Sequence, residues 1–379
     1  MKTTAKTAAA PKVPYWKTEV GAPEADQIRE SIMSGSLSMG KVTEEFERRF
    51  AAVLGVPYAV CTTSGSAALY LAAAAAGIQP GDEVILPNRT FVATAHAMML
   101  AGGSIRLVDT QKNDTLIDED AVEARLTKKT KAIVAVHLNG NSVDMGKINT
   151  VAKKRGLLVI EDAAQGFYSK NKGGFLGAQS DLGCFSLGVT KYITTGQGGV
   201  VVTRSRELYE KLQLHRNHGV DNTFVASYER FGFNLKFNDV LASIGLVQLG
   251  KLEAKKRAHL KLYHYYREAL ADLDFVEVMT VKEEQGNIPL WVEALVSDRG
   301  AMVKLLAEHN IQVRPFLPDL DRSAHLGAQG CDFPSSRRFA RHGIFLPSGP
   351  DLPIEFAERT VEVLRTLGPK LPGKAPLKP

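Results

Sequence analysis

The sequence predicts an α/β protein with a largely parallel sheet covered by helices and a smaller α+β domain towards the C-terminus. Three observations lead to this prediction. Short apolar runs alternate with helical segments between residues 58 and 161. A charged amphipathic helix at about residues 246–270 is long enough to join two domains. The chain of 379 residues is also longer than one simple domain usually is, so we expect two domains.

The expected large domain spans residues 15–250. Its strands are predicted at residues 58–62, 83–87, 105–108, 132–137, 157–161 and 200–203. An alanine-rich helix at residues 65–76 follows the first strand, and a helix at residues 90–100 follows the second. Uninterrupted apolar strands separated by helices are typical of parallel sheets that are buried on both faces. Ligands bind such sheets at the carboxyl ends of the strands.

The expected small domain spans residues 251–367. It has predicted strands near residues 275–278 and 290–295, and predicted helices near residues 299–309 and 354–367. Residues 1–14 and 368–379 form a basic head and a basic tail. Both are rich in Lys, Pro, Ala and Thr, so we expect them to be disordered.

The formal net charge of +6 comes from the two ends of the chain. Six lysines in acid-free segments account for it: Lys2, Lys6, Lys12, Lys370, Lys374 and Lys378. The body of the protein is therefore neutral, and a basic face for nucleic acid is not indicated.

The composition also argues against several locations and partners. No apolar run approaches the ~20 residues of a membrane helix, and the N-terminus lacks the apolar segment of a signal peptide. Cys61, Cys184 and Cys331 form no CxxC pair, so we expect small buried side chains rather than a metal site or a disulfide. We expect a cytoplasmic protein without a metal, a membrane or a nucleic-acid partner.

Two polar motifs follow predicted strands. Residues 62–66 (TTSGS) lie between a strand and a helix, where N–H groups and hydroxyls form a cradle for phosphate. The alternative is an ordinary helix cap with a glycine turn. Glu161 and Asp162 end another strand, where a buried carboxylate needs a positive partner. That partner is either a protonated pyridine nitrogen or the cation of a structural salt bridge.

The third motif surrounds Lys191. Residues 186–191 precede a glycine turn at residues 195–199. A partly desolvated lysine amine has a lowered pKa and becomes nucleophilic towards an aldehyde. Taken alone, a lysine before a glycine turn is usually a solvated surface residue. The order of phosphate cradle, acid and lysine along the chain is what indicates one common cofactor.

These stretches resemble the fold-type I sugar aminotransferases of the DegT/DnrJ/StrS family over roughly residues 20–366. The matching blocks are residues 35–40, 63–69, 81–87, 90–95, 161–165, 186–199 and 232–234. The resemblance implies an aspartate aminotransferase-like fold with a mostly parallel seven-stranded sheet. It also implies pyridoxal 5′-phosphate (PLP) as the cofactor.

The resemblance implies a role for each matched position. Lys191 would hold PLP as a Schiff base and shuttle a proton, and Asp162 would pair with the pyridine nitrogen. Gln165 would donate to the ring oxygen O3′, and Phe91 would stack on the ring. The phosphate would be held by Ser64, Gly65, Ser66 and Ser186, and by Asn234 from the neighbouring subunit. The last contact implies a homodimer with shared active sites.

The chain departs from the family at four places that we expect to border the substrate pocket. Gln197 stands where a glutamate is usual, Lys236 where an arginine is common, and Asn139 where a tyrosine is frequent. Residues 317–320 lack a histidine that often follows the preceding proline. Arg216, Lys236 and Arg314 are candidates for binding an anionic substrate, and arginine binds carboxylate and phosphate through two parallel hydrogen bonds.

The function implied by the resemblance is amino transfer from L-glutamate to a keto-sugar, typically a nucleotide-linked one, in a ping-pong reaction through pyridoxamine phosphate. A keto-cyclitol or a keto-sugar phosphate remains an alternative acceptor. A sugar dehydratase is disfavoured because those relatives replace the lysine with histidine. A catalytically silent ligand-binding regulator is disfavoured by the intact Lys191 and Asp162. The sequence has no GxGxxG after the first strand, which disfavours a nicotinamide dehydrogenase.

Overall fold

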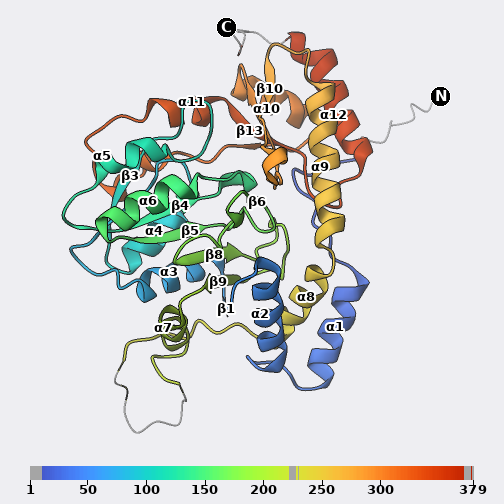
Figure 1. Ribbon diagram of the computed structural model, residues 1–379. Coiled ribbons are helices and arrows are strands. Elements are labelled where there is room, and N and C mark those ends of the chain that lie inside the picture. Colours follow the sequence, from blue (N-terminus) through green and yellow to red (C-terminus); the bar gives the residue numbers. More distant parts are fainter. Residues whose placement is uncertain (1–10, 222–227, 229, 371–376, 378–379) are drawn as a thin grey trace.

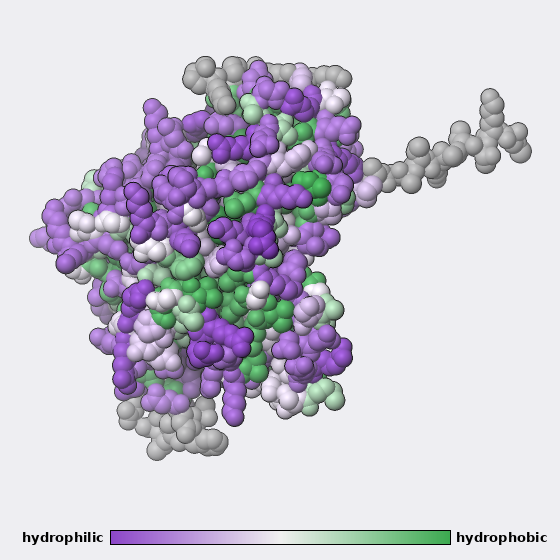
Figure 2. Space-filling view, turned by 45° about the vertical axis from the view of Figure 1, so that its right-hand side comes forward, coloured by the Kyte–Doolittle hydropathy of each residue, from purple (hydrophilic) through white to green (hydrophobic). Residues whose placement is uncertain are grey.

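A computed structural model describes residues 11–221, 228, 230–370 and 377 of the chain. A seven-stranded sheet in the order β1-β9-β8-β5-β4-β2-β3 forms the centre of the larger domain, and helices flank it (Figure 1). A four-stranded sheet lies beside the long helix α9 and forms the smaller domain. Figure 2 shows that one face of the molecule is mostly hydrophilic, with a hydrophobic area near its middle. The predicted fold class is confirmed.

The central sheet is parallel except for one strand. Its strands are β1 (Tyr58–Thr62), β2 (Glu83–Pro87), β3 (Ser104–Val108), β4 (Thr130–Val136), β5 (Leu158–Asp162), β8 (Leu182–Ser186) and β9 (Gly199–Thr203). Strand β9 runs antiparallel to both β1 and β8. The sequence predicted every strand but β8, which has a glycine in its apolar run and follows a hairpin of two short strands, β6 (Lys170–Asn171) and β7 (Gly174–Phe175).

The helices of the larger domain are α1 (Ala22–Met33), α2 (Lys41–Leu54), α3 (Gly65–Ala75), α4 (Ala93–Leu100), α5 (Val122–Arg125), α6 (Met145–Arg155) and α7 (Arg206–Arg216). Helix α4 begins later than the predicted residue 90. The preceding loop is held to the smaller domain instead, since the Asn88 side chain donates to Asp321 at 3.0 Å and to Ser336 at 2.8 Å.

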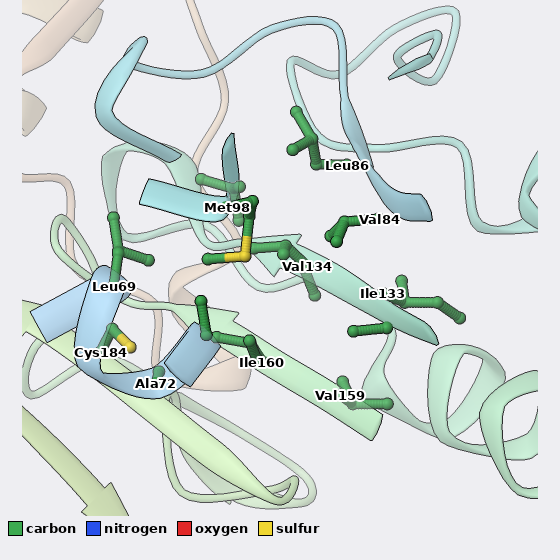
Figure 3. Close-up of a cluster of buried hydrophobic side chains, with 14 of the residues drawn as sticks. Leu69, Ala72, Val84, Leu86, Met98, Ile133, Val134, Val159, Ile160 and Cys184 are labelled. Carbon is green, nitrogen blue, oxygen red and sulfur yellow. The ribbon is translucent and has the colours of Figure 1, made fainter. Parts of the chain in front are cut away.

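An apolar core lies between the sheet and helices α3 and α4 (Figure 3). Leu69 and Ala72 of α3 and Met98 of α4 face Val134 of β4 and Ile160 of β5. These side chains are at most 3% exposed. Their burial fixes the strands whose carboxyl ends form the site described below.

The predicted helix at residues 246–270 is wrong as one element. Helix α8 (Asp239–Leu249) ends before Gly250, and α9 (Leu252–Ala269) begins a new helix. Gly250 weakens the helix at this point because glycine is a poor helix former.

The smaller domain contains β10 (Val276–Val278), β11 (Val292–Val296), β12 (Arg314–Pro315) and β13 (Gly343–Leu346) in an antiparallel sheet of order β10-β11-β13-β12. Its helices are α10 (Arg299–Glu308), α11 (Pro334–His342) and α12 (Ile354–Leu367). The sequence analysis did not assign α11, β12 or β13. Helix α12 packs along α9.

Two expectations about the chain ends and the cysteines are corrected. Residues 11–14 were expected to be disordered, yet Val13 is fully buried and its N–H donates to Asn310 O at 2.9 Å. Residues 1–10 and most of the tail lie outside the described residues. Cys61 and Cys184 are buried as expected, whereas Cys331 is exposed.

The described part of the chain has neither a membrane-spanning helix nor a cluster of metal ligands. No helix there is both long enough and apolar enough to cross a membrane. Nor do three or more His, Cys, Asp or Glu side chains gather there in a way that could hold a metal ion.

Asp239 joins α8 to the start of α2, which generates a test of this packing. Its buried carboxylate accepts from Gly40 N and Thr43 N, both at 2.9 Å, and from Thr43 Oγ1 at 2.7 Å. Asp239→Ala should lower the free energy of unfolding by about 1–3 kcal/mol in urea titrations, because these donors lose their partner. Asp26→Ala, which removes an exposed ion pair with Arg29, should cost less than about 1 kcal/mol. Equal effects of the two substitutions would contradict this assignment.

Candidate active site

The carboxyl ends of β5 and β8 and the start of α3 border one cavity of about 310 Å³. The smaller domain closes it with Trp291, Arg314 and Leu317. Nine residues predicted from the sequence line it together: Ser64, Gly65, Ser66, Phe91, Asp162, Gln165, Ser186, Lys191 and Arg314. The three motifs therefore meet in one place, because parallel strands end at one edge of the sheet.

The first part of the cavity is the N-terminus of α3. Ser64 caps this helix, and its Oγ accepts from Ala67 N at 3.0 Å. The next residue must be small, since a Cβ on Gly65 would lie 2.7 Å from Ser186 Cβ. Gly199 must also lack a side chain, because a Cβ there would lie 2.2 Å from Ser64 O. This close approach of backbone and hydroxyl groups at a helix N-terminus fits a phosphate group.

Asp162 lies at the end of β5 with its carboxylate buried. Oδ2 accepts from Thr94 Oγ1 at 2.7 Å and Oδ1 accepts from Ala164 N at 3.1 Å. Within the described residues no cation forms an ion pair with it, and burial raises its pKa. A protonated ring nitrogen would supply the missing positive charge.

The neighbouring Glu161 has a different role. Its carboxylate accepts from His137 Nε2 at 2.9 Å, Gly177 N at 2.8 Å, Gln179 N at 2.7 Å and Ser180 Oγ at 2.8 Å. Glu161 is thus occupied by structural partners on the other face of the strand, and it does not line the cavity.

Lys191 follows β8 and faces the small domain across the cavity. Its Nζ lies 5.3 Å from the centroid of the Trp291 ring. Burial lowers the pKa of Lys191 to about 8, while the negative charge of Asp162 opposes this shift and Arg314 adds to it. The amine is therefore neutral in a larger fraction of molecules near physiological pH than the amine of an exposed lysine, and the neutral form is the nucleophile.

Gln165 and Phe91 border the same cavity. Gln165 Oε1 accepts from Asn139 N at 2.8 Å, and no described residue accepts from Gln165 Nε2. That amide group can therefore donate to a ligand. Phe91 is 49% exposed and carries an aromatic ring that is free to pack against a flat ligand.

Two of the three expected substrate-binding cations lie elsewhere. Arg216 is buried, forms an ion pair with Glu47 at 2.5 Å and donates to Cys61 O at 3.1 Å. Lys236 Nζ donates to Asn217 Oδ1 at 3.1 Å. Neither lines the cavity of its own chain, so Arg216 is a structural residue here, and of the three candidates Arg314 is the one that lines this cavity.

Asn234 also lies outside the cavity of its own chain. Its side chain is exposed, and helix α8 is capped by Asn238, whose Oδ1 accepts from Leu241 N at 2.9 Å. The alternative role of Asn234 as the cap of α8 is therefore excluded.

The four departures from the family pattern are distributed unevenly. Leu317 lines the cavity, whereas Gln197 and Lys236 do not. Asp319 forms a buried ion pair with Arg89 at 3.0 Å, and Asn139 lies beneath Trp291. The expectation that all four border the pocket is wrong, because most of them support its wall or lie away from it.

Sequence reasoning missed Thr94 and Trp291. Thr94 lies within a matched block, so its position one helical turn beyond Thr90 could have indicated it. Trp291 precedes β11 in the smaller domain, and no local signal connects it to Lys191.

Comparison with known proteins agrees with this geometry. The sequence model that defines the DegT/DnrJ/EryC1/StrS aminotransferase family matches residues 19–365 of this chain. The chain belongs to this family. The predicted family is therefore confirmed, and the protein is an aminotransferase.

Three family relatives illustrate the similarity. GDP-perosamine synthase of Caulobacter vibrioides is 33% identical over 80% of this chain and 84% of its own length. The dTDP-3-amino-3,6-dideoxy-alpha-D-galactopyranose transaminase of Aneurinibacillus thermoaerophilus is 32% identical over 89% of this chain and 93% of its own. Spr1654 of Streptococcus pneumoniae, described as a sugar aminotransferase and solved in its PLP form, matches with a TM-score of 0.89 and 25% identity over 96% of this chain and 99% of its own.

The electrostatic relation between Asp162 and Lys191 generates a test. Asp162→Asn removes a negative charge that favours the protonated amine, so the pKa of Lys191 should fall further below about 8. The pH dependence of amine labelling at Lys191 in the apoenzyme, followed by peptide mapping, measures this shift. The profile at exposed Lys131 should not change. An unchanged or raised midpoint at Lys191 would contradict the stated cause.

Proposed function

We propose that this aminotransferase binds PLP at Lys191 and transfers an amino group from L-glutamate to a keto-sugar, specifically a nucleotide-linked one. The observation that carries the proposal is the meeting of Lys191, Asp162 and the Ser64–Ser66 cradle in one cavity. Relatives named for GDP-linked and dTDP-linked amino sugars support the acceptor class. We place this reaction in the cytoplasm.

Bound PLP supplies an aldehyde carbon and an electron-accepting ring. Lys191 would hold the cofactor through its amine and would carry the proton that is transferred in the reaction. Asp162 would keep the pyridine nitrogen protonated, because a buried carboxylate is stabilised by a positive partner. Gln165 would donate to O3′ and Phe91 would pack against the ring. Ser66 and Ser186, at the start of α3 and the end of β8, would hold the phosphate.

Arg314 is the cation that remains for the substrates. Among the described residues that line the cavity, only Lys191 and Arg314 carry a positive charge. A guanidinium binds a carboxylate or a phosphate through two parallel hydrogen bonds. Arg314 therefore binds the glutamate carboxylate in one half-reaction and an anionic group of the acceptor in the other. A keto-cyclitol or a keto-sugar phosphate is the alternative acceptor.

The active form is a homodimer with shared sites. An apolar groove of about 700 Å³ adjoins the cofactor cavity, and both are lined by Ser64, Ser66, Phe91 and Ala93. Large apolar side chains are exposed along the groove, among them Leu100, Phe231 and Phe233. Exposed apolar surface next to a polar site is typical of a protein–protein interface. Asn234 directly follows Phe233, so a second copy seated here would bring it to the phosphate of the first.

The acceptor is tested with enzyme loaded as pyridoxamine phosphate. Adding nucleotide-linked keto-sugars should restore the PLP absorbance, and L-glutamate should return the enzyme to the pyridoxamine form. Borohydride should attach the cofactor to Lys191, and Lys191→Ala should reduce turnover by about 10²–10⁴-fold because proton transfer is lost. A response to keto-cyclitols alone would establish the alternative acceptor. Attachment at another lysine would exclude the proposed site.

Sharing of sites is tested by mixing variants. Subunits with Lys191→Ala and subunits with Asn234→Ala should form heterodimers in which one site carries both defects and the other carries neither. Activity should then return on mixing, up to about the activity of one intact site per heterodimer. No recovery, together with demonstrated exchange of subunits, would place Asn234 in its own chain's site. A fully active monomer in light scattering would exclude the dimer.

A further inference from the structure

Asn139 is a buried residue to which the proposed reaction assigns no role. It lies in the turn after β4, is 1% exposed and has φ 52° and ψ 27°. Asparagine adopts this left-handed conformation more readily than most residues with a side chain. The following Gly140 has φ 79°, and a Cβ there would lie 2.0 Å from Ile288 O. The turn is thus pressed directly against the segment that leads into β11.

The carboxamide of Asn139 pairs with both backbone polar groups of Trp291. Trp291 N donates to Asn139 Oδ1 at 2.7 Å, and Asn139 Nδ2 donates to Trp291 O at 3.0 Å. Leu290 N donates to Asn139 O at 3.3 Å and extends the contact. The Asn139 side chain of the larger domain therefore fixes Trp291 of the smaller domain through two backbone hydrogen bonds, as the backbone of a paired strand would.

The backbone of the same residue holds Gln165. Asn139 N donates to Gln165 Oε1 at 2.8 Å, which orients the carboxamide so that its Nε2 is the group left for a ligand. Gln165, Trp291 and Lys191 all line the cofactor cavity, whereas Asn139 does not. Asn139 therefore contacts two walls of the cavity from behind.

We propose that Asn139 is a positioning residue of the active site, which holds the Trp291 indole against Lys191 and the Gln165 amide towards the ring oxygen of the cofactor. The role in turnover rests on the proposed function, while the role in holding Trp291 does not. A tyrosine, frequent at this position in the family, has no carboxamide to pair with both the N–H and the C=O of Trp291. The position of Trp291 in this chain therefore depends on the carboxamide of Asn139.

The first test uses tryptophan fluorescence of the apoenzyme. The chain has two tryptophans, so Trp16→Phe leaves Trp291 as the sole indole. In this background Asn139→Ala should shift the emission to longer wavelength and increase quenching by acrylamide. Trp291 is 8% exposed in the native protein, and in the variant its backbone N–H and C=O lose the carboxamide that pairs with them. Asn139→Asp keeps the acceptor for Trp291 N but loses the donor to Trp291 O and faces the buried Glu293 carboxylate, so it should also shift the emission. Asn149→Ala, which removes a half-buried asparagine of α6 outside the cavity, should show none.

The second test follows Lys191 itself. Burial lowers the pKa of Lys191 to about 8. If Trp291 becomes mobile in Asn139→Ala, water should reach the amine, and the pH midpoint of Lys191 labelling should rise. With keto-sugar and glutamate, turnover should fall by about 10²-fold as the reacting groups lose their alignment. If the alanine variant does not fold, Asn139→Gly, which adopts φ 52° without strain, takes its place.

The outcomes separate this proposal from the proposed function. Unchanged emission, quenching and labelling in the Asn139 variants would overturn the positioning role, whatever the acceptor. Changed emission and labelling without turnover on any keto-sugar would leave the positioning role intact and reject the acceptor.

Discussion

A buried ion pair between Arg89 and Asp319 holds the small domain at the carboxyl edge of the large sheet, and the cavity depends on this contact. The two side chains are 5% and 2% exposed, and the Arg89 guanidinium also lies 4.6 Å from the centroid of the Phe316 ring. Removing one partner of a buried pair leaves an uncompensated charge, which is strongly destabilising. Together with the hydrogen bonds of Asn88 and Asn139 to the small domain, the pair fixes the relative position of the domains. Trp291, Arg314 and Leu317 can line the cavity only in that position.

At the end of β5, two adjacent carboxylates have different roles because their surroundings differ. Glu161 points to one face of β5 and is saturated by four hydrogen bonds from structural donors. Asp162 points to the other face, accepts two hydrogen bonds and has no cation among the described partners. The alternation of side chains along a strand produces this difference. The chain thereby presents one unneutralised carboxylate to a ligand and places the amine of Lys191 within its electrostatic influence.

The residues that differ from the family pattern lie at different distances from the cavity. Leu317 lines it, Asn139 contacts its lining residues Trp291 and Gln165, and Asp319 pairs with Arg89 outside the lining. A substitution at Asn139 can therefore alter the cavity wall without replacing any residue that lines it.

The sequence by itself determined the central strands apart from β8, and the positions of Ser64–Ser66, Asp162 and Lys191 at strand ends. These features depend on local patterns, namely apolar runs, a glycine at a helix start and small residues around a lysine. Only the tertiary structure decided which cations reach the cavity. Arg216 and Arg314 look alike in the sequence, yet Glu47, distant along the chain, neutralises Arg216. Likewise, the burial of Val13 and the wall formed by Trp291 arise from contacts between segments far apart in the chain. Such contacts leave no local pattern, because their energy exists only after the domains have packed together.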